Sequence, residues 1–333
     1  MGKKDNAILS VIVPMYNVQN QIVDLLTSLN GIDFDCFSVD VILIDDGSSD
    51  FTLNKVHAFL NQTTNRALRE NTQVISIANS GQSVARNVGL RSSRATYIWF
   101  VDSDDVLRTE VVNKQILPLL ESGTYDFVQL NYCRFMTTLP NLAERTSVAE
   151  KVRPKDLFRE LAIGKIDSFP WVHIVKNKLI KSSDFFPEDM AYEDVATSYT
   201  LIEAAQSIVK LNEVAYFYRY RRGSITLSSD KNKIDDFYHA LGLIKQSANV
   251  DIANFGKNTW NLFISRMLMV IYVEMLRSRD SDAILKYKKK LSRELCEVRV
   301  KGQPFSYSVK YLLMRLNLLG VTFRVKDFIQ YEK

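Results

Sequence analysis

Cysteine and histidine are both scarce in this chain of 333 residues. The three cysteines (Cys36, Cys133 and Cys296) are odd in number and far apart. This usage is typical of a reducing cytoplasm and argues against a disulfide framework or a cysteine zinc site. The three histidines show no metal-ligand spacing, so we do not expect a histidine-based zinc enzyme.

Long apolar runs are missing as well. Residues 1–6 (MGKKDN) form no apolar segment and lead straight into an apolar run, so we expect no signal segment. The longest apolar candidate, from Trp260 to Leu276, contains Arg266 and Glu274, so we expect no membrane span. The chain is nevertheless typical of a globular protein, because 46% of its residues are hydrophobic and 24% are charged.

The positive charge is concentrated near the C-terminus. From Lys286 to Lys333 there are 12 Lys and Arg against 4 Asp and Glu, although the whole chain has a net charge of only +5. An apolar stripe in the same region consists of Val309, Leu312, Leu313, Leu316 and Leu319. This stripe fits either a helix packed on the protein or an interfacial helix, and its basic surroundings favour peripheral contact with an anionic membrane. The region resembles no nucleic-acid module, so we expect no nucleic-acid partner.

Short apolar strands and amphipathic helices alternate over the first third of the chain. The predicted strands are 8–13, 39–44, 73–77 and 97–101, and the predicted helices are 22–29, 53–60, 82–90 and 109–121, the last capped by Thr109. This alternation predicts an α/β fold, with a mainly parallel sheet flanked by helices on both faces.

After a strand near 125–130 the alternation stops. A loop is predicted for 139–152 and a helix for 155–163. A second helix is introduced by residues 190–195 and runs to about 205, and a strand is predicted for 213–220, whereas 171–180 is ambiguous. From Lys233 onward the pattern is helical. We therefore expect a first domain over 1–228, with a nucleotide-binding half at about 8–105 and an acceptor half at 106–228. A helical, basic region follows over 229–333.

Four polar loops follow the predicted strands. They are Pro14–Asn17, Asp45–Asp50, Asn79–Gly81 and Asp102–Asp105. In parallel sheets ligands bind at the carboxyl ends of the strands, so these loops form a candidate site. The last loop carries three carboxylates, which repel one another and need a cation or strong hydrogen-bond donors. A hard divalent cation that shares its remaining positions with phosphate oxygens is the obvious occupant.

The ordered motifs resemble a known family. They are Ser10–Asn17 (SVIVPMYN), Ile44–Asp50 (IDDGSSD), Asn79–Gly89 (NSGQSVARNVG), Phe100–Asp105 (FVDSDD) and Tyr192–Asp194 (YED). Together they resemble the family 2 inverting glycosyltransferases of bacterial surface polysaccharide synthesis, which have the GT-A fold. The resemblance covers roughly residues 8–226, and the helical tail lies outside it.

The resemblance implies a UDP-sugar donor and a divalent cation, Mn²⁺ or Mg²⁺. It places Pro14 and Tyr16 against the uracil ring and Asp46 on a nitrogen of that ring. In the Asp-x-Asp motif it makes Asp102 the contact to the ribose and Asp104 the metal ligand.

The resemblance implies further roles by position. On the nucleotide-sugar side it places Asn17, Asn79, Gly81, Arg86, Asn87 and Ser103, with Arg222 and Ser224 near the donor diphosphate or the acceptor. It makes Asp194 the general base. Glu193 is the alternative base or a charge that complements the helix dipole. Arg86 fits a helix-surface ion pair as well, and Asp45 fits a residue that satisfies loop amides.

We therefore expect an inverting hexosyltransferase, located in the cytoplasm and peripherally at the inner face of the cell membrane. It would transfer sugar from a UDP-sugar to a lipid-linked saccharide in capsule or exopolysaccharide synthesis, through one metal-assisted displacement. The alternative is a non-catalytic scaffold with a degenerate transferase domain. A nucleotidyltransferase is disfavoured because residues 14–20 contain no glycine or basic residue. The sequence leaves open the donor sugar and whether the chain forms a homo-oligomer.

Overall fold

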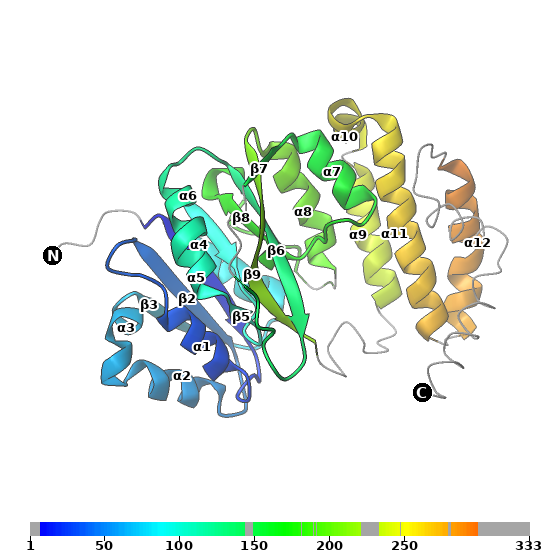
Figure 1. The fold of residues 1–333 in the computed structure, drawn as a ribbon. Coiled ribbons are helices and arrows are strands. Elements are labelled where there is room, and N and C mark those ends of the chain that lie inside the picture. The colour runs from blue at the N-terminus through cyan, green and yellow to red at the C-terminus, as the bar shows by residue number, and fades with distance from the viewer. Residues whose placement is uncertain are drawn as a thin grey trace. The chain divides into compact units, whose positions relative to one another are not determined.

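The computed structural model describes residues 7–143, 149–180, 182–188, 190, 192–220, 233–246, 248–278 and 281–298. The chain divides into two compact units. The first consists of Met1–Pro154 and Ser168–Ser224, and the second of Lys155–Asp167 and Ile225–Lys333. Figure 1 shows the sheet of the first unit and the helices of the second.

The first unit is built on a nine-stranded sheet with the order β3-β2-β1-β4-β8-β6-β9-β5, and β7 pairs with β9. Its strands are β1 (Leu9–Met15), β2 (Val39–Asp46), β3 (Thr72–Ile77), β4 (Tyr97–Phe100), β5 (Val106–Leu107), β6 (Phe127–Phe135), β7 (Glu150–Val152), β8 (His173–Lys176) and β9 (Ile208–Arg219). Its main helices are α1 (Ile22–Asn30), α2 (Thr52–Leu60), α3 (Arg66–Glu70), α4 (Gln82–Ser92) and α8 (Glu193–Ala204).

The first four strands are all parallel, as the alternating pattern predicts. β1 lies between β2 and β4, so the chain builds outward to β3 and then returns to the other side of β1. That reversal places the loops after β1 and β4 next to each other, at the crevice where open α/β sheets bind ligands. The second half of the sheet is mixed, because β8 runs antiparallel to both β4 and β6.

Both faces of β1 are buried, which explains its almost continuous apolar sequence. Leu9, Val11 and Val13 lie in one apolar cluster with the buried face of α1. Ile12 faces the other side and packs with Ala85 of α4. A side chain at position 89 of α4 would collide with Ile12, so a glycine there allows the helix to lie close to the sheet. The predicted α/β fold with helices on both faces is confirmed.

The helix predicted over 109–121 is present but irregular. It consists of α5 (Thr109–Val111), a π-helical turn (Val112–Ile116) and α6 (Leu117–Glu121). Pro118, which has no N–H group, is the second residue after the π turn. The predicted cap is wrong, because the Thr109 hydroxyl donates to the carbonyl oxygen of Ser28 on another helix.

Two other segments differ from their predictions. The predicted loop 139–152 ends in the short strand β7, which pairs with β9. The ambiguous segment 171–180 contains the central strand β8, flanked by two short 3₁₀ turns. β9 begins at Ile208, five residues before the predicted start. The predicted start was too late because Lys210 and Asn212 interrupt the apolar pattern of this strand.

The second unit is helical. It contains α7 (Pro154–Ala162), α9 (Lys233–Gln246), α10 (Ala248–Phe255), α11 (Lys257–Ser278) and α12 (Ser281–Glu297), which confirms the predicted C-terminal helical extension. The Phe158 ring of α7 stacks on Phe255 with a centroid distance of 4.0 Å. α12 packs through Tyr287, whose ring stacks on Tyr238 of α9 at 4.8 Å.

Two expectations concern this unit. Among the helices that the structure describes, none is long and apolar enough to cross a membrane. The apolar stripe of Val309 to Leu319 lies outside the described residues. The domain limits of 1–228 and 229–333 stay a prediction.

Candidate active site

Asn17 ties the loop after β1 to the loop after β2. Its side-chain oxygen accepts hydrogen bonds from the N–H groups of Ser49 at 2.9 Å and Asp50 at 3.3 Å, and its own N–H donates to the Ser48 hydroxyl at 3.1 Å. Asn17 has a φ of 51°, a left-handed conformation that asparagine tolerates better than most residues. Asn17 therefore acts within the protein as a loop connector.

The preceding residues present an aromatic ring at this edge. Pro14 is buried at the end of β1, whereas Tyr16 is 47% exposed, unusual for a large side chain beside the centre of a sheet. An exposed ring here can stack on a flat ligand. Asp45 accepts a hydrogen bond from the N–H of Ser48 at 3.3 Å, which supports its interpretation as a residue that satisfies loop amides.

Asp46 joins the ends of β2 and β3. Its two carboxylate oxygens accept hydrogen bonds from the N–H groups of Ser80 at 2.7 Å and Gly81 at 2.9 Å. Gly47 has a φ of +69°, and a Cβ at this position would lie 2.7 Å from the nitrogen of Asn79. Asp46 thus fixes the loop that begins α4, and its role on the uracil ring stays a prediction.

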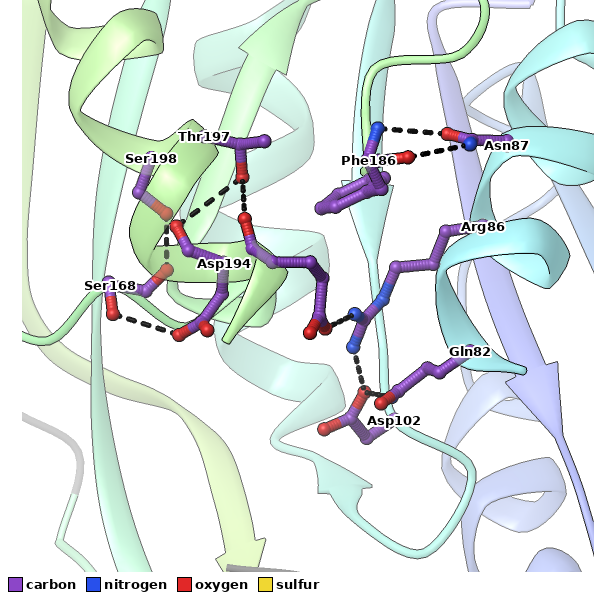
Figure 2. A network of polar contacts seen from close by, with 10 residues as sticks. Gln82, Arg86, Asn87, Asp102, Ser168, Phe186, Asp194, Thr197 and Ser198 are labelled. Carbon is purple, nitrogen blue, oxygen red and sulfur yellow. Dashed lines mark hydrogen bonds and ion pairs between the residues drawn. The ribbon is translucent and has the colours of Figure 1, made fainter. Parts of the chain in front are cut away.

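Arg86 lies at the centre of the polar network in Figure 2. Its side chain is 3% exposed and pairs with Glu193 at 2.5 Å and Asp102 at 3.1 Å. Burial alone would lower its pKa, but these two carboxylates outweigh that effect and raise it. The interpretation of Arg86 as a helix-surface ion pair is therefore wrong. The buried guanidinium connects the Asp-x-Asp motif with the start of α8, and Gln82 also donates to Asp102 at 3.2 Å.

Asp194 stands in the first turn of α8, beside this network (Figure 2). Its carboxylate accepts a hydrogen bond from the Ser168 hydroxyl at 2.8 Å. Burial, followed by the charge of Glu193, raises the pKa of Asp194 to about 6. Glu193 is instead paired with Arg86, so the two adjacent acids have different surroundings. The arrangement gives Asp194 a proton affinity suited to general-base work near neutral pH.

The three carboxylates after β4 do not share one environment. Asp105 is buried, and its oxygens accept hydrogen bonds from the Tyr216 hydroxyl and the N–H of Arg219, both at 2.6 Å. Asp105 is thus satisfied by strong hydrogen-bond donors of the protein. Asp102 and Asp104 are half-buried and are the candidates for binding a ligand. Ser103 between them is buried.

Asp102 and Asp104 could bind a divalent cation whose remaining coordination positions are filled by a bound ligand. The pKa of Asp102 is raised by burial and by the nearby charge of Asp104, although Arg86 opposes both. Within the described part of the chain, no group of three or more His, Cys, Asp or Glu side chains could hold a metal by itself. Mg²⁺ and similar ions commonly bind through one or two carboxylates plus phosphate oxygens, and the two aspartates could supply that share.

Several residues depart from their sequence-based interpretation. Asn87 is fully buried, and its side-chain amide exchanges hydrogen bonds with the backbone of Phe186, so it positions the segment before α8. Trp171 is buried and stacks on Tyr216 at 4.4 Å in the apolar core. Arg222 and Ser224 lie outside the described residues.

Sequence reasoning missed four residues of this region: Gln82, Ser168, Tyr216 and Arg219. Gln82 lies inside a quoted motif without an assigned role. The other three are distant in sequence from the loops that they contact, and no local pattern marks them.

Comparison with known proteins places the chain among sugar-transferring enzymes. The chain is 25% identical over 97% of its length to the uncharacterized glycosyltransferase EpsJ of Bacillus subtilis, covering 96% of that protein. It is 27% identical over 75% of its length to the poly(ribitol-phosphate) beta-N-acetylglucosaminyltransferase TarS of Staphylococcus aureus strain Mu50, covering 42% of that longer protein.

The fold is also shared with solved structures. The crystal structure of S. aureus TarS residues 1–349 in complex with UDP-GlcNAc superposes with a TM-score of 0.67 at 21% identity, over 93% of this chain and 88% of that one. This likeness confirms the GT-A fold. The model of the family described as "Glycosyl transferase family 2" matches residues 10–181, which include β1 except its first residue, β2 to β8 and all four strand-end loops. The chain therefore belongs to glycosyltransferase family 2.

Proposed function

We propose that this enzyme is an inverting transferase that moves a sugar from a UDP-sugar to a saccharide acceptor, with Asp194 as the general base. The observation that carries the proposal is the contrast between the two adjacent acids at the start of α8. Glu193 is paired with a buried arginine, whereas Asp194 contacts a neutral hydroxyl and has a pKa raised to about 6.

In this mechanism Asp194 takes the proton of an acceptor hydroxyl while the acceptor oxygen attacks the anomeric carbon. The bond from that carbon to the diphosphate breaks on the opposite side, and UDP leaves. One base and one displacement lead to inversion, and no carboxylate nucleophile is required. Arg86 keeps Glu193 in an ion pair, so Asp194 is the acid of this pair that serves as the base.

The donor side is proposed from the strand-end loops. The exposed ring of Tyr16, beside Pro14, would stack on the uracil. Asp46 would contact a nitrogen of the uracil ring. Asp102 would bind the ribose, and Asp104 would hold Mn²⁺ or Mg²⁺ together with the diphosphate. Asn17, Asn79, Gly81 and Ser103 would shape these loops. A bound cation would neutralise charge on the departing diphosphate.

The acceptor is proposed to be a lipid-linked saccharide in surface polysaccharide synthesis, at the inner face of the cell membrane. The relative TarS is named for transfer to a poly(ribitol-phosphate), which supports a polymeric acceptor. On α12, Lys288 and Lys289 are exposed and offer positive charge to an anionic surface. Arg222 and Ser224 are proposed to contact the donor diphosphate or the acceptor.

A donor screen tests the proposal. We would measure release of UDP from a panel of UDP-sugars with a saccharide acceptor, with and without Mn²⁺, and determine the anomeric configuration of the product. We expect release from at least one donor, faster with Mn²⁺, and an inverted product. Release from no donor under any metal would support a non-catalytic scaffold, and a retained configuration would remove the single-displacement mechanism.

A further inference from the structure

Arg219, the last residue of β9, makes three polar contacts to two other segments. Its Nε–H donates to the carbonyl oxygen of Asp104 at 2.7 Å, and its backbone N–H donates to the carboxylate of Asp105 at 2.6 Å. Its Nη2 pairs with Asp24 in the first turn of α1 at 2.6 Å. The guanidinium also lies over the Phe135 ring, 4.5 Å from the centroid.

We propose that Arg219 is a positioning residue that holds the Asp102–Asp105 loop against α1, and so places the carboxylate of Asp104 for donor binding. This proposal rests on the proposed function, since it assumes that Asp104 serves the donor diphosphate and its cation. Arg219 binds Asp104 through the peptide oxygen, so the carboxylate of Asp104 takes no part in that contact.

Tyr216 completes this attachment from the same strand. Its hydroxyl accepts a hydrogen bond from the N–H of Asp102 at 3.1 Å and donates one to Asp105 at 2.6 Å. The end of β9 therefore contacts the loop at three of its four residues. β5, which follows the loop, also pairs with β9 through Val106. These contacts hold the backbone of the loop that carries Asp102 and Asp104 in one arrangement.

The ion pair with Asp24 extends the attachment to the loop after β1. That loop carries Tyr16 and leads into α1, whose first turn contains Asp24. The proposed uracil contact and the proposed metal ligand are thus connected through Arg219 across the crevice. A hydrogen bond from a charged donor is worth about tenfold or more in an equilibrium constant.

A cavity of about 600 Å³ adjoins this residue. Its lining includes Arg219, Asp24, Thr27 and Leu139. The Arg219 side chain remains 12% exposed, so solvent reaches it. Removal of the side chain would enlarge the cavity, and a small guanidinium ion could enter the vacated position.

The test compares four variants by calorimetric titration of UDP with and without Mn²⁺. Arg219→Ala removes the side-chain contacts, Arg219→Lys keeps the charge but lacks the Nε–H donor, and Asp24→Asn weakens only the ion pair. Arg134→Ala is the matched control, because Arg134 is exposed on the neighbouring strand β6. Hydrogen exchange of the amides of residues 102–105 gives a second readout that does not depend on nucleotide.

We expect Arg219→Ala to weaken UDP binding in Mn²⁺ by about tenfold or more and to leave binding without Mn²⁺ within about twofold. Arg219→Lys and Asp24→Asn should have smaller effects in the same direction, and the control none. Millimolar guanidinium chloride should partly restore binding to Arg219→Ala, whereas equal potassium chloride should not. The amides of residues 102–105 should exchange faster in Arg219→Ala than in the control.

Wild-type affinity of Arg219→Ala in Mn²⁺, or an equal loss with and without Mn²⁺, would overturn the proposal. If Arg219→Ala does not fold, wild-type affinity in both Arg219→Lys and Asp24→Asn would overturn it. Failure of the proposed donor would look different, because the wild-type protein itself would then show no metal-dependent UDP binding. In that case unchanged exchange of the amides of residues 102–105 in Arg219→Ala would still refute the positioning role.

Discussion

The carboxyl group of Asp194 is subject to opposing influences. Burial and the charge of Glu193 raise its pKa, while the Ser168 hydroxyl and the charge of Arg86 lower it, and the result is a pKa of about 6. Because this pKa exceeds the ordinary aspartate value of 3.8, folding favours the protonated acid. The associated stability is fully present below about pH 4 and is lost as the pH rises through 6. Burial of this acid therefore lowers the free energy of unfolding near neutral pH.

Replacement of Asp194 tests the base directly. Asp194→Asn should lower transfer by about a hundredfold or more, because the amide cannot take a proton. UDP binding, measured by calorimetry, should change little, since Asp194 lies outside the strand-end loops of the nucleotide side. Transfer near the wild-type rate would assign the role to Glu193 or to solvent.

Two neighbours of Asp194 should shift the pH dependence in opposite directions. Transfer should rise with pH as Asp194 ionises, with a midpoint near its pKa of about 6. Ser168→Ala removes a hydrogen bond that lowers this pKa, so the midpoint should move to higher pH. Glu193→Gln removes a negative charge that raises it, so the midpoint should move to lower pH. The profile of kcat/KM against pH decides, and shifts of the same sign in both variants would contradict this assignment.

Asp104 should matter for the metal and not for folding. Asp104→Asn should abolish the enhancement of UDP binding by Mn²⁺, because a hard cation prefers charged oxygen ligands. Asp35→Asn, at an exposed position, is a control for the loss of one negative charge. Unchanged UDP affinity of Asp104→Asn in Mn²⁺ would show that Asp104 is not a ligand, and thermal unfolding checks that the fold is intact.

At the scale of elements, the site depends on how the strand ends contact one another. The junction between the ends of β2 and β3 is tight, because Gly47 has a left-handed φ and its Cα faces the backbone nitrogen of Asn79. Gly123 offers a comparison, since its φ of +64° is similar but nothing lies within 4 Å of its missing Cβ.

These two glycines predict different costs. Gly123→Ala should lower the free energy of unfolding by about 1–2 kcal/mol through the left-handed backbone alone. Gly47→Ala should cost more, because the new methyl group also displaces Asn79, and it should weaken UDP binding. Urea unfolding of both variants measures the difference. Equal losses of unfolding free energy in the two variants would mean that the backbone at Asn79 moves easily to make room for the methyl group.

The sequence predicted the elements of the first half well and the contacts between distant elements poorly. β1 to β4 and their helices follow from short apolar runs and helical spacing, which are local signals. The candidate site at the strand-end loops was predicted from the rule that parallel sheets bind ligands at the carboxyl ends of their strands. By contrast, the pairing of Arg86 with Glu193 joins residues far apart in sequence, and so do the contacts of Ser168 and Arg219.

At the scale of the whole molecule, the charge distribution leads to a prediction about membranes. α12 is packed against other helices, since Leu291 and Leu295 are buried, and Lys286 pairs with Asp235 at 3.0 Å. A truncation at Lys286 would therefore remove a packed helix and unfold part of the protein. The informative truncation begins after Val298, because residues 299–333 still carry 7 Lys and Arg against 2 Asp and Glu.

This truncated chain should keep UDP binding and lose part of its flotation with anionic vesicles. Each basic residue near an anionic surface contributes about 1 kcal/mol, and this part should weaken in high salt. Neutral vesicles are the control for the apolar part of the binding. Equal flotation of both chains, or none of the full chain, would end the membrane hypothesis.

The helix α7 has a consequence for how the protein is made. Leu157, Phe158 and Leu161 of α7 are buried, and the rings that cover Phe158 belong to Phe255, Trp260 and Phe263. On the ribosome, α7 is complete long before these partners are synthesised. Until they emerge, the nascent chain carries an uncovered aromatic surface in the middle of its transferase sequence. A gene cut after residue 228 would leave that surface uncovered permanently.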